Sequence, residues 1–166
     1  MSTLKTTNIQ HPSAGSPAVE LTAAGGLWLG GGKVLQIVRA TDGTNRTTTS
    51  TSFVDASISV TITPQKSDSA ILLVWSLLGA QTGAAGFSRY QITDNSNNAV
   101  SGAQGSFMGS ATTSLGLNAM QTLIGYSTPA TTSATTYKGR FLATAGTNTL
   151  SNNSTPGQLY AIEVSA

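Results

Sequence analysis

The 166-residue sequence has no cysteine and few charged residues. Without cysteine it can form neither disulfides nor thiolate metal sites, so packing must hold the fold together. Charged residues make up 8% of the chain, against roughly 25% in an average soluble domain. Ser, Thr, Asn, Gln and Gly take their place. This composition predicts a polar, nearly neutral surface that repels other copies of itself only weakly.

The sequence also lacks a basic cluster, a long apolar run and an apolar secretory leader. Its eight Lys/Arg residues are scattered along the chain and give a net charge of only +2. Because nucleic-acid binding needs a basic patch or stripe, we expect no nucleic-acid partner. No window of about 18 apolar residues is present, so we expect no membrane partner and synthesis in a cytoplasm.

Catalytic residue types are equally sparse. The one histidine, His11, precedes Pro12 in a segment that offers no rigid site for a general base. The six carboxylates are dispersed, and nothing in the sequence brings two of them together as an acid–base pair or a metal site. We therefore predict a protein that is not an enzyme, with no catalytic residues, no cofactor and no metal. Polysaccharide cleavage stays open as a minor alternative.

Residues 1–32 differ in composition from the rest of the chain. They are rich in Ser, Thr, Pro and Gly and end in a glycine cluster around Trp28. Glycine clusters are typical of hinges and flexible linkers. We interpret residues 1–32 as an N-terminal arm with a Gly-rich linker, and a frayed terminus is the alternative. The residues that we expect to contact a partner are Asn8, Ile9, His11, Pro12, Val19, Leu21 and Trp28.

From residue 33 onward the pattern indicates strands. Ile58, Val60 and Ile62 alternate with Ser59, Thr61 and Thr63, the period-2 signature of a half-buried strand. Shorter or less regular runs and turn residues recur along the chain. The predicted strands are 33–40, 47–53, 58–63, 70–78, 86–94, 119–128, 136–143 and 158–164, with long loops at 101–118 and 146–157. Residues 33–166 thus predict an all-β, jelly-roll-like antiparallel β-sandwich of about eight strands.

Two parts of the sequence resemble a known group of proteins. The opening Leu4-Lys-Thr-Thr-Asn-Ile-Gln-His-Pro-Ser-Ala resembles a phrase that begins virion structural proteins of cyanophages and related marine phages. Residues 59–74 and 159–164 are similar to β-sandwich modules of phage fibre and decoration proteins. The matching stretches cover about a fifth of the chain. The resemblance implies a homotrimer on the virion.

The chain has no long repetitive shaft, which favours a capsid decoration or cement protein over a full tail fibre. Its expected partners are other copies of itself and the major capsid protein or another virion protein. The continuous apolar run from residue 70 to 78 fits a strand that is covered on both faces or meets another subunit. We take Ile71, Leu73 and Trp75 from this run as candidate trimer-interface residues.

The alternative is a short tail-fibre or receptor-binding protein that recognises a host surface glycan. Aromatic residues could stack on sugars, although core or interface packing uses the same residue types and is the favoured interpretation. The aromatic residues in question are Trp28, Phe87, Tyr90, Phe107, Tyr126 and Tyr137.

Overall fold

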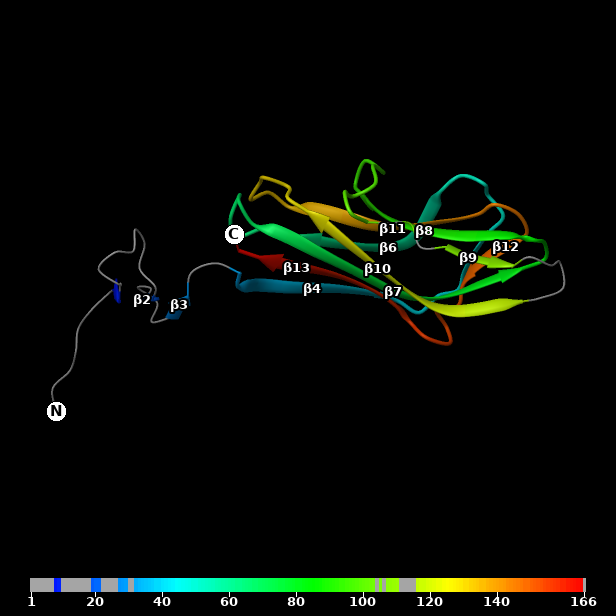
Figure 1. Cartoon of the computed structure of the whole chain (residues 1–166), viewed down its shortest axis with the longest axis horizontal. Coiled ribbons are helices and arrows are strands. Elements are labelled where there is room, and N and C mark those ends of the chain that lie inside the picture. The colour runs from blue at the N-terminus through cyan, green and yellow to red at the C-terminus, as the bar shows by residue number, and fades with distance from the viewer. Residues whose placement is uncertain are drawn as a thin grey trace.

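The computed structural model describes residues 32–103, 105, 107–110 and 116–165, together with three short backbone segments nearer the N-terminus. These residues form strands, turns and loops, with no helix among them (Figure 1). The strands are β1 (Asn8–Ile9), β2 (Val19–Leu21), β3 (Leu27–Leu29), β4 (Val34–Asp42), β5 (Arg46–Thr48), β6 (Val54–Ile62), β7 (Ala70–Thr82), β8 (Gly86–Asp94), β9 (Phe107–Ser110), β10 (Leu117–Ser127), β11 (Thr135–Ala143), β12 (Thr147–Leu150) and β13 (Gly157–Val164).

Two antiparallel sheets pack face to face as a sandwich. One has the order β4-β13-β7, with β10 on the other edge of β7 and the short β12 and β5 continuing the sheet. The other has the order β6-β11-β8-β9. If the eight principal strands β4, β6, β7, β8, β9, β10, β11 and β13 are numbered 1 to 8, the sheets read 1-8-3-6 and 2-7-4-5. This is the jelly-roll order, so the predicted fold class is confirmed.

Two strands lie where the sequence predicts loops. β9 falls within the predicted loop 101–118, and β12 falls within the predicted loop 146–157. β12 pairs with the end of β7 from Gly79 to Thr82, beyond the part of β7 that pairs with β13. Where the sequence predicts a strand at 47–53, the structure has only the three-residue strand β5. Both missed strands are four residues long, too short to show a clear alternation.

The core lies between the sheets and follows the predicted alternation. Ile58, Val60 and Ile62 of β6 are buried, while Ser59 and Thr61 face outward. On β8 the alternation likewise buries Ser88, Tyr90 and Ile92, and the next residue, Thr93, is buried as well. The largest fully buried side chain is Trp75, whose ring meets the Tyr90 ring edge to face at 6.2 Å between centroids. Such edge contacts between aromatic rings add to the stability gained from burial.

A β-bulge lets Trp75 lie close to β11. The register between β6 and β11 shifts between Lys138 and Arg140, and Ser57 adopts a left-handed φ of 57°. The Asp55 carboxylate accepts a hydrogen bond from the Ser57 backbone N–H at 2.7 Å and supports this conformation. Gly139 lies at the bulge, where a Cβ would come within 2.8 Å of the Trp75 ring. The indole therefore occupies space that only a glycine leaves open.

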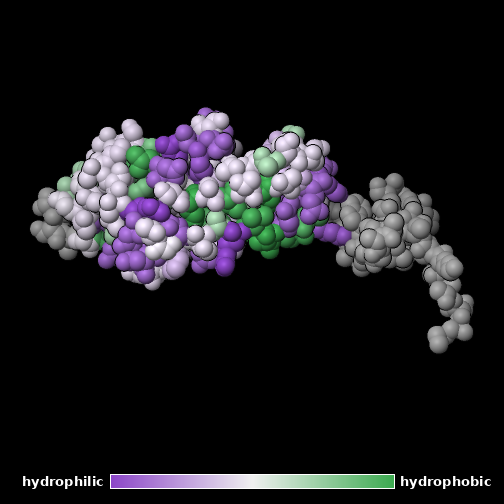
Figure 2. Space-filling model, turned by 180° about the vertical axis from the view of Figure 1, so that it is seen from behind, coloured by the Kyte–Doolittle hydropathy of each residue, from purple (hydrophilic) through white to green (hydrophobic). Residues whose placement is uncertain are grey.

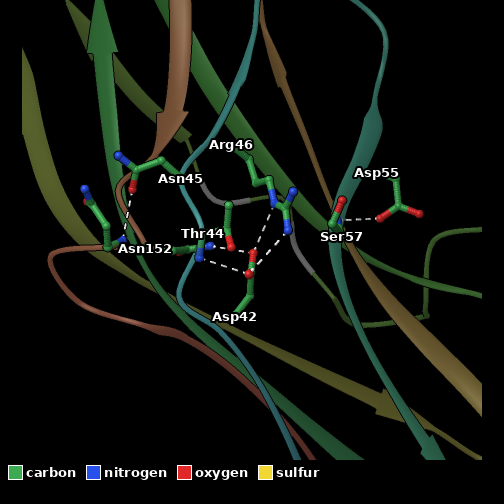
Figure 3. A network of polar contacts seen from close by, with 8 residues as sticks. Asp42, Thr44, Asn45, Arg46, Asp55, Ser57 and Asn152 are labelled. Atoms are coloured by element: carbon green, nitrogen blue, oxygen red, sulfur yellow. Dashed lines mark hydrogen bonds and ion pairs between the residues drawn. The ribbon is translucent and has the colours of Figure 1, made fainter.

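Hydrogen bonds of polar side chains connect two loops at one end of the body (Figure 3). The Asp42 carboxylate accepts hydrogen bonds from the Thr44 backbone N–H, from Arg46 Nε at 3.2 Å and from Asn152 Nδ2 at 3.0 Å. Burial raises the pKa of Asp42, but these hydrogen bonds outweigh it and hold the pKa below its usual value. Asn45 Oδ1 accepts a further bond from the Asn153 backbone N–H. The turn after β4 is thereby joined to the loop before β13.

The N-terminal strands β1, β2 and β3 form a small antiparallel sheet of their own. The sandwich strands begin at Val34 and end at Val164, within the predicted domain 33–166. At its entry, the Gly32 N–H donates to the Ser165 carbonyl, and the Ser165 N–H donates to the Lys33 carbonyl. The division into an arm at residues 1–32 and a sandwich at 33–166 stays a prediction.

Candidate functional site

The predicted trimer-interface residues lie inside the sandwich. Ile71, Leu73 and Trp75 are all at most 1% exposed and belong to the hydrophobic core. They cannot contact a second copy unless the sheets separate, so this prediction chose the wrong face of β7. The outward residues of the same strand are Leu72, Val74, Ser76 and Leu78, which are only partly buried.

These outward residues belong to an apolar surface that crosses four strands, which we call the outer face. One row across it runs Ile37 (β4), Ile162 (β13), Leu72 (β7) and Tyr126 (β10). The next row runs Arg39, Tyr160, Val74 and Ile124. The remaining members of the outer face are Val34, Thr41, Ser76, Leu78, Ala80, Asn118, Met120, Thr122, Gln158 and Val164. Directly opposed residues on neighbouring strands are close enough to touch, so the rows form a continuous surface.

Several apolar side chains of the outer face are open to solvent in the single chain. Ile37 is 60% exposed, Ile124 59% and Met120 55%. Arg39 is the only charged residue among the outward positions of β4, β13, β7 and β10 named above. Figure 2 shows hydrophobic surface along the lower side of the body, near the end where the chain enters β4. A surface of this kind is stabilised when a partner covers it, because apolar area then leaves water.

The size of the outer face is that of a functional patch. Four strands about 4.8 Å apart and about seven residues long at about 3.4 Å per residue give a footprint on the order of 400 Å². Apolar patches of roughly 300–600 Å² on single proteins are often interaction sites. The protruding side chains make the accessible area larger than this flat footprint. One outer face can therefore supply a substantial share of a specific interface.

The edge of the outer face is formed by β10, whose own residues include none of the usual devices against further strand pairing. Its eleven residues include no charged residue and no proline, and its register with β7 is unbroken from Leu117 to Ser127. Within the described ranges, β7 is the only strand that pairs with β10. Sheet edges are usually blunted by charge, proline or a bulge. An unblunted edge of this length favours contact with another chain.

The buried polar groups between the sheets form a structural network. Tyr90 Oη donates to Asn148 Oδ1 at 3.0 Å, and Asn148 Nδ2 donates to the Leu142 carbonyl at 2.8 Å. Ser88 Oγ donates to Gln81 Oε1, and Gln81 Nε2 donates to the Ala145 carbonyl. Burial raises the pKa of Tyr90 to about 12, even though hydrogen bonds with Ser88 and Asn148 act in the opposite direction. These groups satisfy one another and join the two sheets.

Glu163 is a buried carboxylate that holds a loop. It accepts hydrogen bonds from Gln36 Nε2 at 2.6 Å and from the backbone N–H groups of Gln65 at 2.8 Å and Lys66 at 3.3 Å. Burial raises its pKa, but the hydrogen bonds together hold the pKa below the usual value. The side chain points into the sandwich and fixes the loop between β6 and β7 to β13, a structural role that the sequence does not signal.

The predicted arm contacts lie where the structure gives no side-chain geometry. His11 and Pro12 lie outside the described residues. Asn8, Ile9, Val19, Leu21 and Trp28 fall in β1, β2 and β3, for which only the backbone is described. Their contact with a partner stays a prediction.

No group of three or more His, Asp or Glu residues that could hold a metal ion occurs among the described residues. The same part of the chain has no helix long and apolar enough to cross a membrane.

Comparison with known proteins adds no relative. No protein-family model matches the chain, and no curated protein matches it.

Proposed function

We propose that this chain is a structural, non-enzymatic protein of a phage particle, a decoration or cement protein that binds the shell as a homotrimer. The observation that supports an assembly role is the outer face, a mostly apolar surface with exposed Ile37, Met120 and Ile124 and a single charged residue, Arg39. A chain that acts alone gains nothing from such a surface, whereas an assembly protein is stabilised when it is covered. The particle itself is inferred from the resemblance of residues 4–14 and 59–74 to phage virion proteins.

In a trimer each contact joins two different surfaces, because a threefold ring is closed by heterologous contacts. The outer face of one copy then meets another surface of the next copy. The β10 edge adjoins the outer face and its residues include no charge and no proline, so we assign it as part of that counterpart surface. The low charge of the chain keeps the repulsion between copies small.

The arm gives the trimer a second means of attachment. Residues 1–32, when extended, reach on the order of 100 Å, far enough to cross from one shell subunit to another. Three arms on one trimer bind together with increased avidity, because each bound arm raises the effective concentration of the others. The major capsid protein or another virion protein is the proposed binding partner of the arms.

The experiment that tests this function is the copy number of the protein in purified particles, measured by quantitative mass spectrometry against the shell protein. A decoration protein is present at a level near that of the shell protein. A small number of copies per particle, or none, contradicts the proposal.

Deletion of residues 1–24 tests the arm separately. The shortened chain is expected to keep its sandwich and its oligomeric mass but to lose affinity for empty shells. Full affinity of the shortened chain would show that the arm is not the attachment. Sustained hydrolysis of a surface polysaccharide by the intact protein would contradict the non-enzymatic assignment.

A further inference from the structure

A hollow of about 610 Å³ lies at one end of the sandwich. It is formed where the turn after β8, the end of β10 and the start of β11 come together. Its volume is within the roughly 300–1,000 Å³ that ligand sites of proteins have. The residues that line it and bear on its chemistry are Asp94, Asn98, Ser101, Tyr126, Thr128 and Tyr137.

The polar side of the hollow is held in place by hydrogen bonds. Asp94 Oδ1 accepts from the Asn98 backbone N–H at 2.9 Å, and Asp94 Oδ2 accepts from Asn98 Nδ2 at 3.0 Å. Asp94 lies opposite Tyr137 in the β8–β11 register, and Tyr137 Oη donates to Ser127 Oγ at 2.9 Å. A carboxylate oxygen has room for two hydrogen bonds, so Asp94 can accept more from a ligand. The lining therefore presents a fixed carboxylate, an amide and several hydroxyl groups.

The exposed aromatic residue in the lining of the hollow is Tyr126. This side chain is 54% exposed at the end of β10, next to Ser127 in the chain. An exposed aromatic ring offers a flat apolar surface with a polar tip. Only one charged residue, Asp94, lines the hollow, so an anionic ligand is disfavoured there.

A hydroxyl-rich ligand with one apolar face matches both the polar lining of the hollow and the aromatic ring. A pyranose ring has such a face, formed by its C–H groups, and its hydroxyl groups can donate to a carboxylate and accept from an amide or hydroxyl. We propose that this hollow is a binding site for a neutral saccharide, which stacks on Tyr126 and donates hydrogen bonds to Asp94. The hollow shares Tyr126 with the outer face, whereas Asp94, Asn98 and Ser101 belong to the loop end of the sandwich.

The test is a titration of the full-length protein with neutral monosaccharides (glucose, galactose, mannose and N-acetylglucosamine), followed by backbone NMR chemical shifts. At least one sugar is expected to shift the amide signals around Asn98, Tyr126 and Thr128 with millimolar affinity, as for an open site. The same titration with sialic acid tests the class of ligand, and the carboxylate of Asp94 should make that binding weaker.

Two variants locate the site. Tyr126→Ala removes the stacking surface, and Ser101→Trp fills the hollow from an exposed turn position without removing the Asp94–Asn98 bonds. Each should weaken binding by about tenfold or more, which corresponds to about 1.4 kcal/mol. Tyr160→Ala is the matched control, because Tyr160 lies on the outer face but does not line the hollow.

Three results would overturn the proposal: no shift with any neutral sugar, shifts centred away from the hollow, or equal binding by Tyr126→Ala and Tyr160→Ala. Stronger binding of sialic acid than of every neutral sugar would overturn the neutral class. Because Tyr126 also belongs to the outer face, the Ser101→Trp variant, which leaves that face unchanged, is the one that separates this site from the assembly role.

Discussion

At the scale of single residues, close packing explains positions that the sequence alone leaves unassigned. Gly139 has no visible role in the sequence, yet its missing side chain is what lets the Trp75 ring pack against β11 opposite the bulge in β6. Glu163 follows the alternation of β13 as an inward residue, although a charge at such a position would not be expected inside a core. The groups that donate hydrogen bonds to this carboxylate come from residues far away in the chain, so the sequence could not reveal them.

The first prediction concerns Gly139. Replacement by alanine places a Cβ about 2.8 Å from the Trp75 ring and 2.9 Å from Ile58 Cγ2. Because this overpacks a dense core, we expect Gly139→Ala to lower the free energy of unfolding by about 2 kcal/mol. Urea denaturation measures the change. Gly43→Ala is the matched control, since a Cβ there meets nothing within 4 Å. Equal midpoints for the two variants would contradict the packing argument.

The second prediction concerns the pH dependence due to Glu163. The pKa of Glu163 is lower in the folded protein than the usual 4.5. At acidic pH the folded protein therefore binds fewer protons than the unfolded chain does. The contribution of Glu163 to stability is therefore complete above the unfolded pKa and is lost as the pH falls through the folded pKa. We expect Glu163→Gln to cost about 2 kcal/mol at pH 7, because hydrogen bonds to a buried charge are lost.

The measurement is the difference in unfolding free energy between wild type and Glu163→Gln as a function of pH. This difference should be constant near neutral pH and shrink below about pH 4.5. Asp42 and Asp94 also have lowered pKa values, but they are present in both proteins and cancel. A difference that grows as the pH falls would contradict the assignment.

At the scale of strands, alternation predicted which residues are buried wherever only one face is apolar. β6 follows this rule from Ala56 to Ile62, and β8 follows it from Phe87 to Ile92. On β7 the run Ala70 to Leu78 is apolar at nearly every position, so the pattern contains no information about which face points inward. The choice of Ile71, Leu73 and Trp75 as interface residues failed for this reason. Only the pairing with β10 and β13 fixes the phase of β7.

A signal for the outer face was nevertheless present in the sequence. β10 has Met120 and Ile124 on one face and Leu123 on the other, and β13 has Tyr160 and Ile162 opposite Leu159 and Ala161. Strands that are apolar on both faces are typical of sheets covered on both sides. Taken together, these strands indicate a second covered face, but not which strands lie side by side to form it.

The third prediction concerns the bond between the sheets at β8 and β12. Tyr90→Phe removes the hydroxyl that donates to Asn148 and leaves a buried amide oxygen without this donor. We expect a loss of about 1–3 kcal/mol in unfolding free energy. Faster hydrogen exchange in β12 should accompany it. Tyr160→Phe is the control, because its hydroxyl bonds to Gln158 at a half-buried position. Equal unfolding free energies for Tyr90→Phe and Tyr160→Phe would contradict the role given to the Tyr90–Asn148 hydrogen bond.

At the scale of the whole molecule, the jelly-roll body has one polar sheet surface and one apolar sheet surface. β6 shows Ser59 and Thr61 to solvent, whereas β4, β7, β10 and β13 show mostly aliphatic and aromatic side chains. This asymmetry is the feature of the body on which the proposed assembly role rests. Composition predicts a surface that tolerates self-association, and the fold determines which surface it is.

The fourth prediction concerns salt. Because the outer face has one charged residue, Arg39, its association should depend little on ionic strength. The oligomeric mass is expected to be the same in low and high sodium chloride and to be favoured by sulfate, which strengthens apolar association. Sedimentation at several salt concentrations checks this. Dissociation in moderate sodium chloride would indicate an interface held by charges instead.

The most direct test of the assembly surface is the molar mass in solution, measured by size-exclusion chromatography with light scattering. The wild-type protein is expected at three times the mass of one chain. Ile124→Lys, which puts a charge in the outer face at a position already 59% exposed, should give a folded monomer. Ser59→Lys, on the outward side of β6, should leave the trimer intact. A monomeric wild type, or an Ile124→Lys variant with unchanged mass, would contradict the account.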